Sequence, residues 1–260
     1  MTNVFVQFDP AGAGEFHQVD RYLSALDWLA QHRVDVDWVV NLTSSDYPLL
    51  PLNRARDELV AAGADGFADL WPAVGRDSPW SARYAQTSYD FHHRHLGALS
   101  PLARAALTPL HVVNYVQPWA RVRAGAQLSV GRRAKTPFGP DLVLYGGSPA
   151  AALSWPVVAY VREFIARRPE LLAHFRHSLA PADALLPTIL GNSSDFTLIR
   201  DNKRFTLPPA RHSTPAAVSE SDLPEAYERG AHFVTNVDPA ARDAIDARIG
   251  RLADSGVARL

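Results

Sequence analysis

The sequence contains no cysteine among its 260 residues. Disulfide bonds, thiolate metal sites and a thiol nucleophile are therefore excluded. No stretch approaches about 18 uninterrupted apolar residues, which a membrane-spanning helix would need. The first fifteen residues lack a basic start followed by an apolar core, the pattern of a secretory signal. The expectation is therefore a cytoplasmic protein with no integral membrane segment.

The chain also lacks a marked excess of either charge, because it has 26 Lys and Arg residues and 27 Asp and Glu residues. A formal net charge of -1 gives no electrostatic reason to expect nucleic acid or an anionic membrane as a partner. Hydrophobic residues make up 47% of the sequence, enough to build a sizeable core. Repeats, low-complexity tracts and clear linkers are missing, so one domain over 1–260 is expected.

Segments typical of strands and of helices alternate along the chain. Short apolar runs predict strands at 4–8, 38–42, 66–71, 141–148 and 196–200, the fourth ending in a tight turn. Helical spacing of apolar residues predicts helices near 19–31, 54–62, 84–95, 102–107, 156–166, 183–190 and 240–252. This alternation predicts the α/β class, with a mostly parallel central sheet flanked by helices. The run 38–42 has no polar alternation and is expected to be buried on both faces.

Polar residues follow two of these strands. Asn41 to Asp46 follow the run 38–42, and Tyr145-Gly-Gly-Ser148 ends the run 141–148. In parallel α/β sheets, ligands bind beyond the carboxyl ends of the strands. The same residue types are also favoured in ordinary turns, so a binding site and a simple turn are both open interpretations.

Five motifs together resemble one known enzyme family. The segment NLTSSDYPLLPL (41–52) is similar to the signature of the core-2/I-branching β-1,6-N-acetylglucosaminyltransferases, glycosyltransferase family 14, which also holds peptide xylosyltransferases. Further similarities follow in the family's order. They are RYAQTSYDFHHRHL (83–96), YGGSPAAALSWPVVAYVREF (145–164), APADALLPTIL (180–190), and the tail segments SDL (221–223) and HFVTNVD (232–238).

The resemblance implies a GT-A-type fold and a UDP-sugar donor carrying N-acetylglucosamine or xylose. It implies inverting transfer to an acceptor hydroxyl, with no bound metal and no other cofactor. Inversion is a single displacement in which one carboxylate takes the acceptor proton. The residue that matches the family's base is Asp183, where the family has Glu. From the sequence alone, Pro-Ala-Asp before an apolar run is equally typical of a helix N-cap.

The resemblance also implies which residues bind the donor. They are Asp9, Asn41, Ser45, Asp46, Gly147, Ser148, Arg211 and Asn236. Asn236 stands where the family has the Lys that contacts the diphosphate, so Arg229 or Lys203 is an alternative cation. The segment 4–8 matches the family's second strand, and the first strand–helix unit of the family has no counterpart.

Aromatic and cationic residues within and beside these motifs are candidate acceptor contacts. Aromatic rings stack on sugar faces and a guanidinium binds hydroxyls, which suggests Trp80, Arg83, Tyr84 and Trp155. For Trp155, a place in the core is an equal alternative.

Two other functions remain open. A serine hydrolase is suggested by Gly-Gly-Ser148-Pro-Ala between a predicted strand and helix, which approximates a nucleophile elbow. Its triad would continue with Asp183 or Asp195 and then His212 or His232. The other possibility is a catalytically impaired family relative that binds a sugar or a partner. Two metal-like patterns predict no metal site. Asp35-Val-Asp37 precedes a predicted strand rather than following one, and the histidines 92, 93 and 95 have no carboxylate at ligand spacing beside them.

Overall fold

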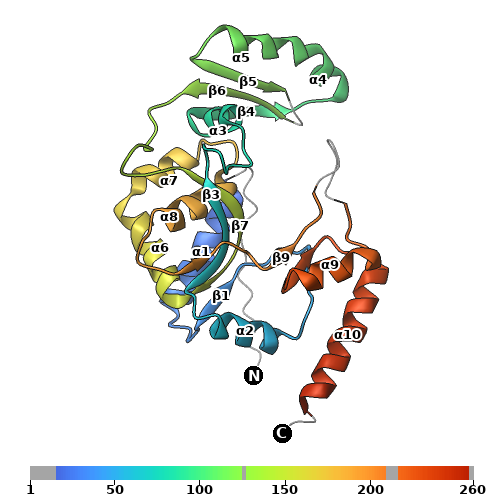
Figure 1. Ribbon diagram of the computed structural model, residues 1–260. Helices are drawn as coiled ribbons and strands as arrows, with labels where there is room; N and C mark the ends of the chain where they lie inside the picture. The colour runs from blue at the N-terminus through green and yellow to red at the C-terminus, as the bar shows by residue number, and fades with distance from the viewer. Residues whose placement is uncertain (1–15, 125–126, 209–215, 258–260) are drawn as a thin grey trace. The chain divides into compact units, whose positions relative to one another are not determined.

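A computed structural model describes residues 16–124, 127–208 and 216–257, and the chain forms two compact units (Figure 1). The first unit comprises 1–36, 70–149 and 158–194, and the second comprises 37–69, 150–157 and 195–260. The chain passes between the units within strands β3 (Gly66–Pro72) and β7 (Tyr145–Ser154), and within helix α6 (Trp155–Arg167). The single domain expected from the sequence stays a prediction. The expected strand at 4–8 lies outside the described residues.

A four-stranded sheet has the order β1-β7-β3-β8, with β1 at Trp38–Val40 and β8 at Leu198–Ile199. Strand β1 pairs antiparallel with β7, whereas β8 pairs parallel with β3. The fold is therefore mixed α/β, and the expected mostly parallel sheet is wrong. Alternating strands and helices imply parallel pairing only when consecutive strands are neighbours. Here β1 pairs with a strand more than a hundred residues further along the chain, so the connection leaves the direction open. Strand β1 is also half-buried rather than buried on both faces.

The predicted tight turn at 145–148 is wrong, because these residues open the ten-residue strand β7. Small residues let the strand run through a crowded region. A Cβ at position 146 would lie 2.4 Å from the Trp80 ring, so only glycine fits there. Ala151, Ala152 and Leu153 are buried further along the strand. Helix α6 starts directly after β7, where the backbone N–H of Trp155 donates to the Asp37 carbonyl at 2.9 Å.

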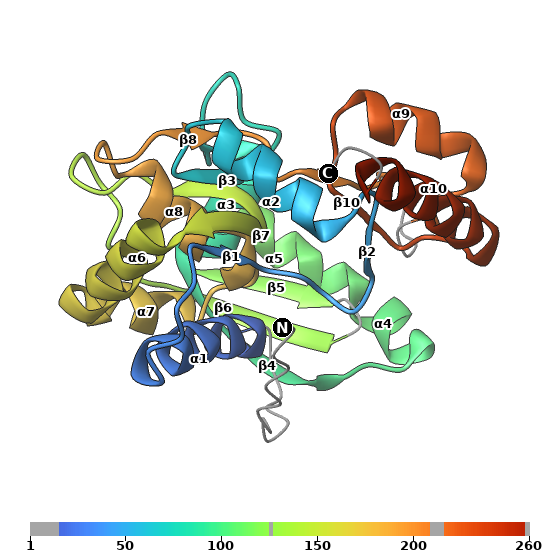
Figure 2. The same ribbon diagram turned by 90° about the horizontal axis from the view of Figure 1, so that it is seen from below.

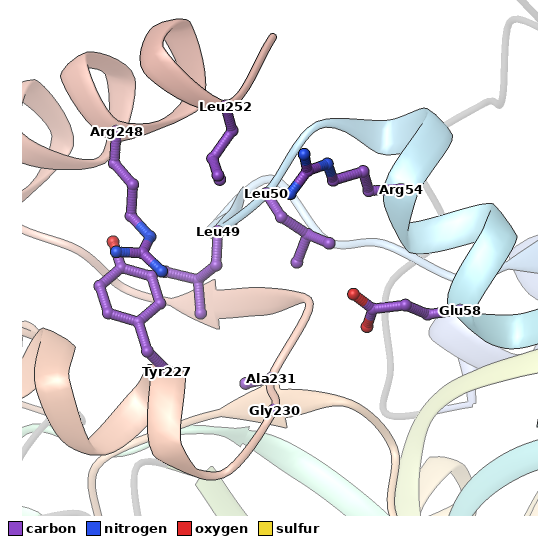
Figure 3. A pocket seen from close by; sticks show the side chains of 9 residues that line it. All are labelled: Leu49, Leu50, Arg54, Glu58, Tyr227, Gly230, Ala231, Arg248 and Leu252. Atoms are coloured by element: carbon purple, nitrogen blue, oxygen red, sulfur yellow. The ribbon is translucent and has the colours of Figure 1, made fainter. Parts of the chain in front are cut away.

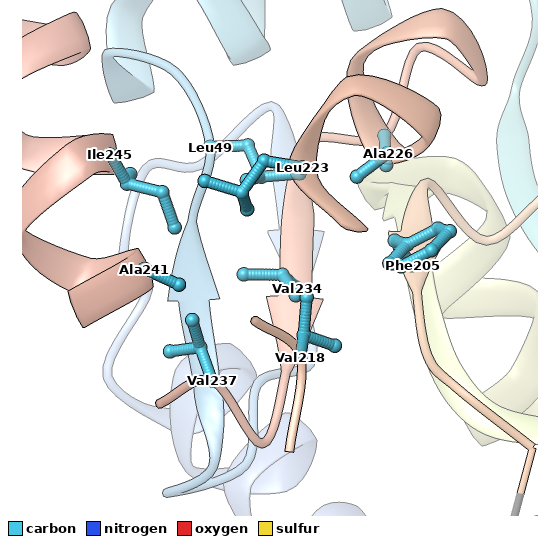
Figure 4. Packing of buried hydrophobic residues seen from close by; sticks show 10 residues of the cluster. Leu49, Phe205, Val218, Leu223, Ala226, Val234, Val237, Ala241 and Ile245 are labelled. Carbon is cyan, nitrogen blue, oxygen red and sulfur yellow. The ribbon is translucent and has the colours of Figure 1, made fainter. Parts of the chain in front are cut away.

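Within the second unit, a smaller sheet has the order β2-β10-β9. Strand β2 (Asp46–Pro48) pairs antiparallel with β10 (Phe233–Thr235), which pairs parallel with β9 (Arg204–Phe205). Helices α9 (Leu223–Glu228) and α10 (Pro239–Val257) pack on this sheet through a buried apolar cluster (Figure 4). Its buried members are Leu49, Phe205, Val218, Leu223, Ala226, Ala231, Val234, Val237, Ala241 and Ile245. Helix α2 (Leu52–Ala61) follows β2 directly.

In the first unit, three antiparallel strands have the order β4-β6-β5, with bounds Phe91–Ala98, Gln127–Arg133 and Ala120–Ala124. Helices α4 (Pro101–Leu107) and α5 (Val113–Val116) flank this sheet, joined by the 3-10 turn Thr108–Val112 (Figure 1). The predicted helix at 84–95 is confirmed in its first half and wrong in its second half. Helix α3 (Ala82–Tyr89), capped by the Ser81 hydroxyl, ends before β4 begins. Phe91 and His93 are buried and His92 between them is half-buried, which is the two-residue alternation of a strand and not the spacing of a helix.

The remaining helices of the first unit are α1 (His17–Gln31), α7 (Pro169–Phe175) and α8 (Leu185–Gly191), with a 3-10 turn at Pro181–Asp183. Figure 2 shows α6 beside α7 in yellow. The predicted helices near 19–31, 54–62, 102–107, 156–166, 183–190 and 240–252 are confirmed within a few residues. In the described ranges, no helix is both long and apolar enough to cross a membrane.

Candidate functional site

The motif 41–52 is organised around a buried ion pair between Asp46 and Arg204. The Arg204 Nε donates to Asp46 Oδ2 at 3.4 Å, and the two side chains are 4% and 2% exposed respectively. Asp46 Oδ2 also accepts the Thr43 backbone N–H at 2.7 Å, and Oδ1 accepts the Thr235 hydroxyl at 2.6 Å. Burial lowers the pKa of the Arg204 guanidinium, and the Asp46 carboxylate opposes that shift. Both carboxylate oxygens are thus engaged in holding the loop onto β9 and β10.

Three other residues expected to bind the donor lie around this pair. Arg204 also donates through Nη2 to the Asn41 carbonyl, so the end of β1 is attached to the same guanidinium. The Asn236 N–H donates to the Ser45 carbonyl at 2.9 Å, and the Asn236 carbonyl accepts the Val218 N–H at 2.8 Å. The structure therefore brings Asn41, Ser45, Asp46 and Asn236 together. The sequence did not indicate Arg204 or Thr235, since their role depends on pairing across strands distant in the chain.

The backbone conformation at position 236 explains why Asn is found there. Its φ angle is 60°, in the left-handed region that disfavours most side chains but that Asn tolerates. A Lys at this position, as the family has, would be strained. The two alternative cations are already engaged: Lys203 pairs with Asp201 at 2.9 Å, and Arg229 pairs with Glu225.

A cluster of aromatic rings lies in the first unit. Trp80 stacks on Tyr89 with ring centroids 5.7 Å apart, and Trp80 and Tyr84 meet edge to face with centroids 5.2 Å apart. Trp80 is half-buried and Tyr84 is 37% exposed, so the cluster reaches the surface. Gly146 packs against the Trp80 ring, which places the start of β7 beside the expected acceptor residues.

The aromatic cluster connects to the turn that carries Asp183. The hydroxyl of the fully buried Tyr89 donates to the Ala180 carbonyl at 2.8 Å. Asp183 closes the 3-10 turn that follows, and it is half-buried. Its backbone N–H donates to the same Ala180 carbonyl at 3.2 Å. The predicted N-cap role is wrong for its side chain, because no side chain caps α8, whose N-cap position is Ala184.

The other predicted site residues have separate positions. Gly147 is buried and Ser148 half-buried, both inside β7; Arg83 is exposed on α3; Trp155 is half-buried at the start of α6. Ser148 is followed by six more strand residues, so the nucleophile elbow expected there is wrong, because it needs a turn between strand and helix. Asp9, Arg211 and His212 lie outside the described residues.

Histidines in the first unit form a buried cluster that the sequence did not predict. His174 Nε2 is 2.7 Å from the Tyr89 carbonyl and must donate to it, so Nδ1 accepts from His92 Nε2 at 3.2 Å. Burial lowers the pKa of His174 to about 4 and also lowers the pKa of His92. His93 is buried as well and bonds the Thr87 carbonyl at 2.7 Å. Among the described residues, no group of three or more potential ligands is arranged to hold a metal ion.

The chain matches no protein family model and no curated protein sequence. The motif resemblance and the geometry above are therefore the basis on which a function is inferred.

Proposed function

We propose that the protein is an inverting, metal-independent glycosyltransferase that moves a sugar from a UDP-sugar to an acceptor hydroxyl. The proposal starts from the five motifs that resemble the core-2/I-branching family. The observation that carries it furthest is the link through Tyr89, which stacks on Trp80 and holds the turn of Asp183 through the Ala180 carbonyl. One side chain thus supports both an aromatic surface for a sugar and a carboxylate that can act as a base.

In this proposal the acceptor sugar lies on the exposed part of the Trp80–Tyr84 pair. Rings present apolar faces to the C–H face of a sugar, which orients its hydroxyls. The acceptor oxygen attacks the anomeric carbon and forms the new glycosidic bond. The bond from that carbon to the UDP oxygen breaks, and UDP leaves with the electron pair. Asp183 takes the acceptor proton as the bond forms.

On the donor side, few charged groups are free to bind a diphosphate among the residues that the structure describes. The Asp46 carboxylate is occupied by Arg204 and Thr235, and Asn236 carries no charge. The role of Arg211 in binding the diphosphate stays a prediction. Without a metal, cationic groups have to stabilise the departing diphosphate. These features favour a second candidate, a family relative that binds a sugar but does not transfer one. In that case the Trp80–Tyr84 pair binds the sugar and the Asp183 turn is structural.

Donor binding and turnover separate the two candidates. UDP, UDP-N-acetylglucosamine and UDP-xylose are titrated into the protein by calorimetry, and UDP release is followed with a panel of hydroxyl acceptors. The transferase proposal predicts donor binding, transfer with inverted configuration, and loss of transfer but not of binding in Asp183→Asn. Asp141→Asn, an exposed change in the same unit, is the matched control and leaves transfer unchanged. Absence of binding to all three nucleotides contradicts the proposal, and sugar binding without turnover supports the second candidate.

A further inference from the structure

An open cavity of about 170 Å³ lies within the second unit (Figure 3). It is lined by Leu49, Leu50, Arg54, Glu58, Tyr227, Gly230, Ala231, Arg248 and Leu252. Figure 3 shows Arg54 and Glu58 reaching into it from α2, opposite Arg248 and Tyr227, with Leu252 and Ala231 on the remaining sides. Leu49 and Ala231 are buried core residues, so the cavity has an apolar floor beneath a charged rim.

Two guanidinium groups line this cavity from different helices. Arg248 lies over the Tyr227 ring, with its Cζ 4.0 Å from the ring centroid. This cation–π contact holds the guanidinium beside the cavity that both residues line. Within the described ranges, neither Arg54 nor Arg248 forms an ion pair, whereas Arg204 and Arg229 of the same unit do. A planar guanidinium matches the two oxygens of a carboxylate.

The third charge in the cavity belongs to Glu58. Its Oε2 is 2.9 Å from Nε2 of His232, a side chain 2% exposed. Burial lowers the pKa of His232, so at neutral pH the ring donates Nε2–H without adding a positive charge. The Glu58 carboxylate has further acceptor capacity toward the cavity.

The cavity therefore offers two positive charges and one negative charge around an apolar floor. A simple anion would meet Glu58, and a simple cation would meet both arginines. A zwitterion satisfies all three groups, with its carboxylate on the arginines and its ammonium on Glu58. We propose that this cavity binds a small zwitterion, namely an α-amino acid with a branched apolar side chain, which lies against Leu49, Leu50 and Leu252. A cavity of this size suits a small ligand, since about 150 Å³ accommodates benzene.

The cavity shares Leu49 and Leu50 with the motif 41–52 but lies away from its Asp46–Arg204 ion pair. In the β2–β10 ladder, Asp46 lies opposite Thr235 at one end and Pro48 lies opposite Phe233 at the other. The cavity is lined by residues that follow β2 and by residues that precede β10, beyond the second end, together with Arg248 and Leu252 of α10. The proposal therefore does not depend on the glycosyltransferase function, and failure of one leaves the other standing.

Three probes of one shape test the charge pattern by calorimetry and ligand-observed NMR. L-Leucine carries both charges, 4-methylpentanoate lacks the ammonium, and 3-methylbutylamine lacks the carboxylate. We expect L-leucine to bind and each analogue to bind at least ~10-fold more weakly, because a hydrogen bond to a charged group is worth that much. Arg248→Gln and Glu58→Gln should each weaken L-leucine binding ~10-fold or more. Arg56→Gln, an exposed change on α2 outside the cavity, serves as the control and should leave it unchanged.

Two results would overturn the proposal. One is no detectable binding of L-leucine at ~20 mM, about the weakest affinity worth assigning to a built site. The other is equal binding of L-leucine and either analogue, which would show that the charges do not select the ligand. Both substituted side chains are exposed, so we expect the two variants to fold like the unmodified protein. Thermal melting of each variant checks this and separates lost binding from unfolding.

Discussion

The Arg204 guanidinium and the Asp46 carboxylate form an ion pair with both side chains almost completely removed from solvent. The pair joins the end of β1, the start of β2 and the first residue of β9, since Arg204 also donates to the Asn41 carbonyl. Thr235 adds β10 through its bond to Asp46. The motif resembles a donor-binding loop, but its Asp46 carboxylate is the centre of a structural network.

Asp46→Ala is expected to lower the free energy of unfolding by about 3–5 kcal/mol, because it leaves a buried guanidinium without its partner. The loss is measured as a lower urea midpoint by circular dichroism and as faster amide exchange at Val234 and Asn236. Asp57→Ala is the control, since Asp57 pairs with Arg56 at the surface and its loss should change stability by less than about 1 kcal/mol.

A double replacement tests whether the stability lost in Asp46→Ala comes from the unpaired charge of Arg204. Arg204→Met in the Asp46→Ala background should recover part of the lost stability, because no unpaired charge is left inside. If Asp46→Ala alone is as stable as the unmodified protein, the pair does not hold the loop and the network has no energetic role.

Gly146→Ala tests the close approach of β7 to Trp80. An added Cβ would lie 2.4 Å from the ring, so the ring or the strand has to move. We expect a loss of about 1–3 kcal/mol, typical of overpacking in a core, and a change in tryptophan fluorescence. Gly139→Ala is the control, since no atom lies within 4 Å of the position that its Cβ would take, and it should be close to neutral. Equal melting temperatures for the two variants would contradict the close packing of Gly146 against Trp80.

Variants of Asn236 test whether backbone conformation explains why this chain has Asn where the family that it resembles has Lys. Asn236→Lys and Asn236→Ala should each lose about 1 kcal/mol, because both must adopt a left-handed φ of 60°. Asn236→Gly should be neutral within about 0.5 kcal/mol. Chemical denaturation of the three variants gives the comparison. A stable Lys variant beside an unstable Ala variant would show that charge, not φ, decides this position.

Regular elements with strong local patterns were predictable from the sequence. Helix α1 shows its apolar stripe, and β3 is an apolar run bounded by turn residues, so periodicity is enough. Strands β9 and β10 were not predicted, since two or three residues carry no period and exist only through pairing. The course of β7 was also missed. Gly-Gly-Ser-Pro normally indicates a turn, and only the Trp80 ring explains why glycine is needed inside a strand.

The site was predictable to a smaller degree. Asn41, Ser45, Asp46 and Asn236 were expected at one place and do lie together. Their organiser, Arg204, carries no local signal, because one arginine in a short polar segment looks like any surface residue. The same holds for Arg54 and Arg248, which are nearly two hundred residues apart and meet only through the fold.

The pair of the buried His174 and the half-buried His92 makes stability dependent on pH. His174 has a pKa of about 4 in the folded chain, lowered by burial, whereas an unfolded chain has a pKa near 6.5. Since the unfolded state binds the proton more tightly, stability is fully present above pH 6.5 and is lost as pH falls toward 4. At about 1.4 kcal/mol per pKa unit, His174 contributes up to ~3 kcal/mol of this loss. His92, whose pKa burial also lowers, adds to it in the same direction.

The measurement is urea unfolding at pH 7.5, 6, 5 and 4.5, compared between the unmodified protein and two variants. His174→Gln removes the titrating ring, so its stability should fall less steeply below pH 6.5. His177→Gln replaces an exposed ring whose centroid lies 5.0 Å from that of His92, and it should keep most of the pH dependence. An NMR titration of the His174 ring protons gives an independent test that does not need a stable variant. If that ring titrates near 6.5 in the folded protein, it is hydrated, and the bond from Nε2 to the Tyr89 carbonyl does not hold it inside the core.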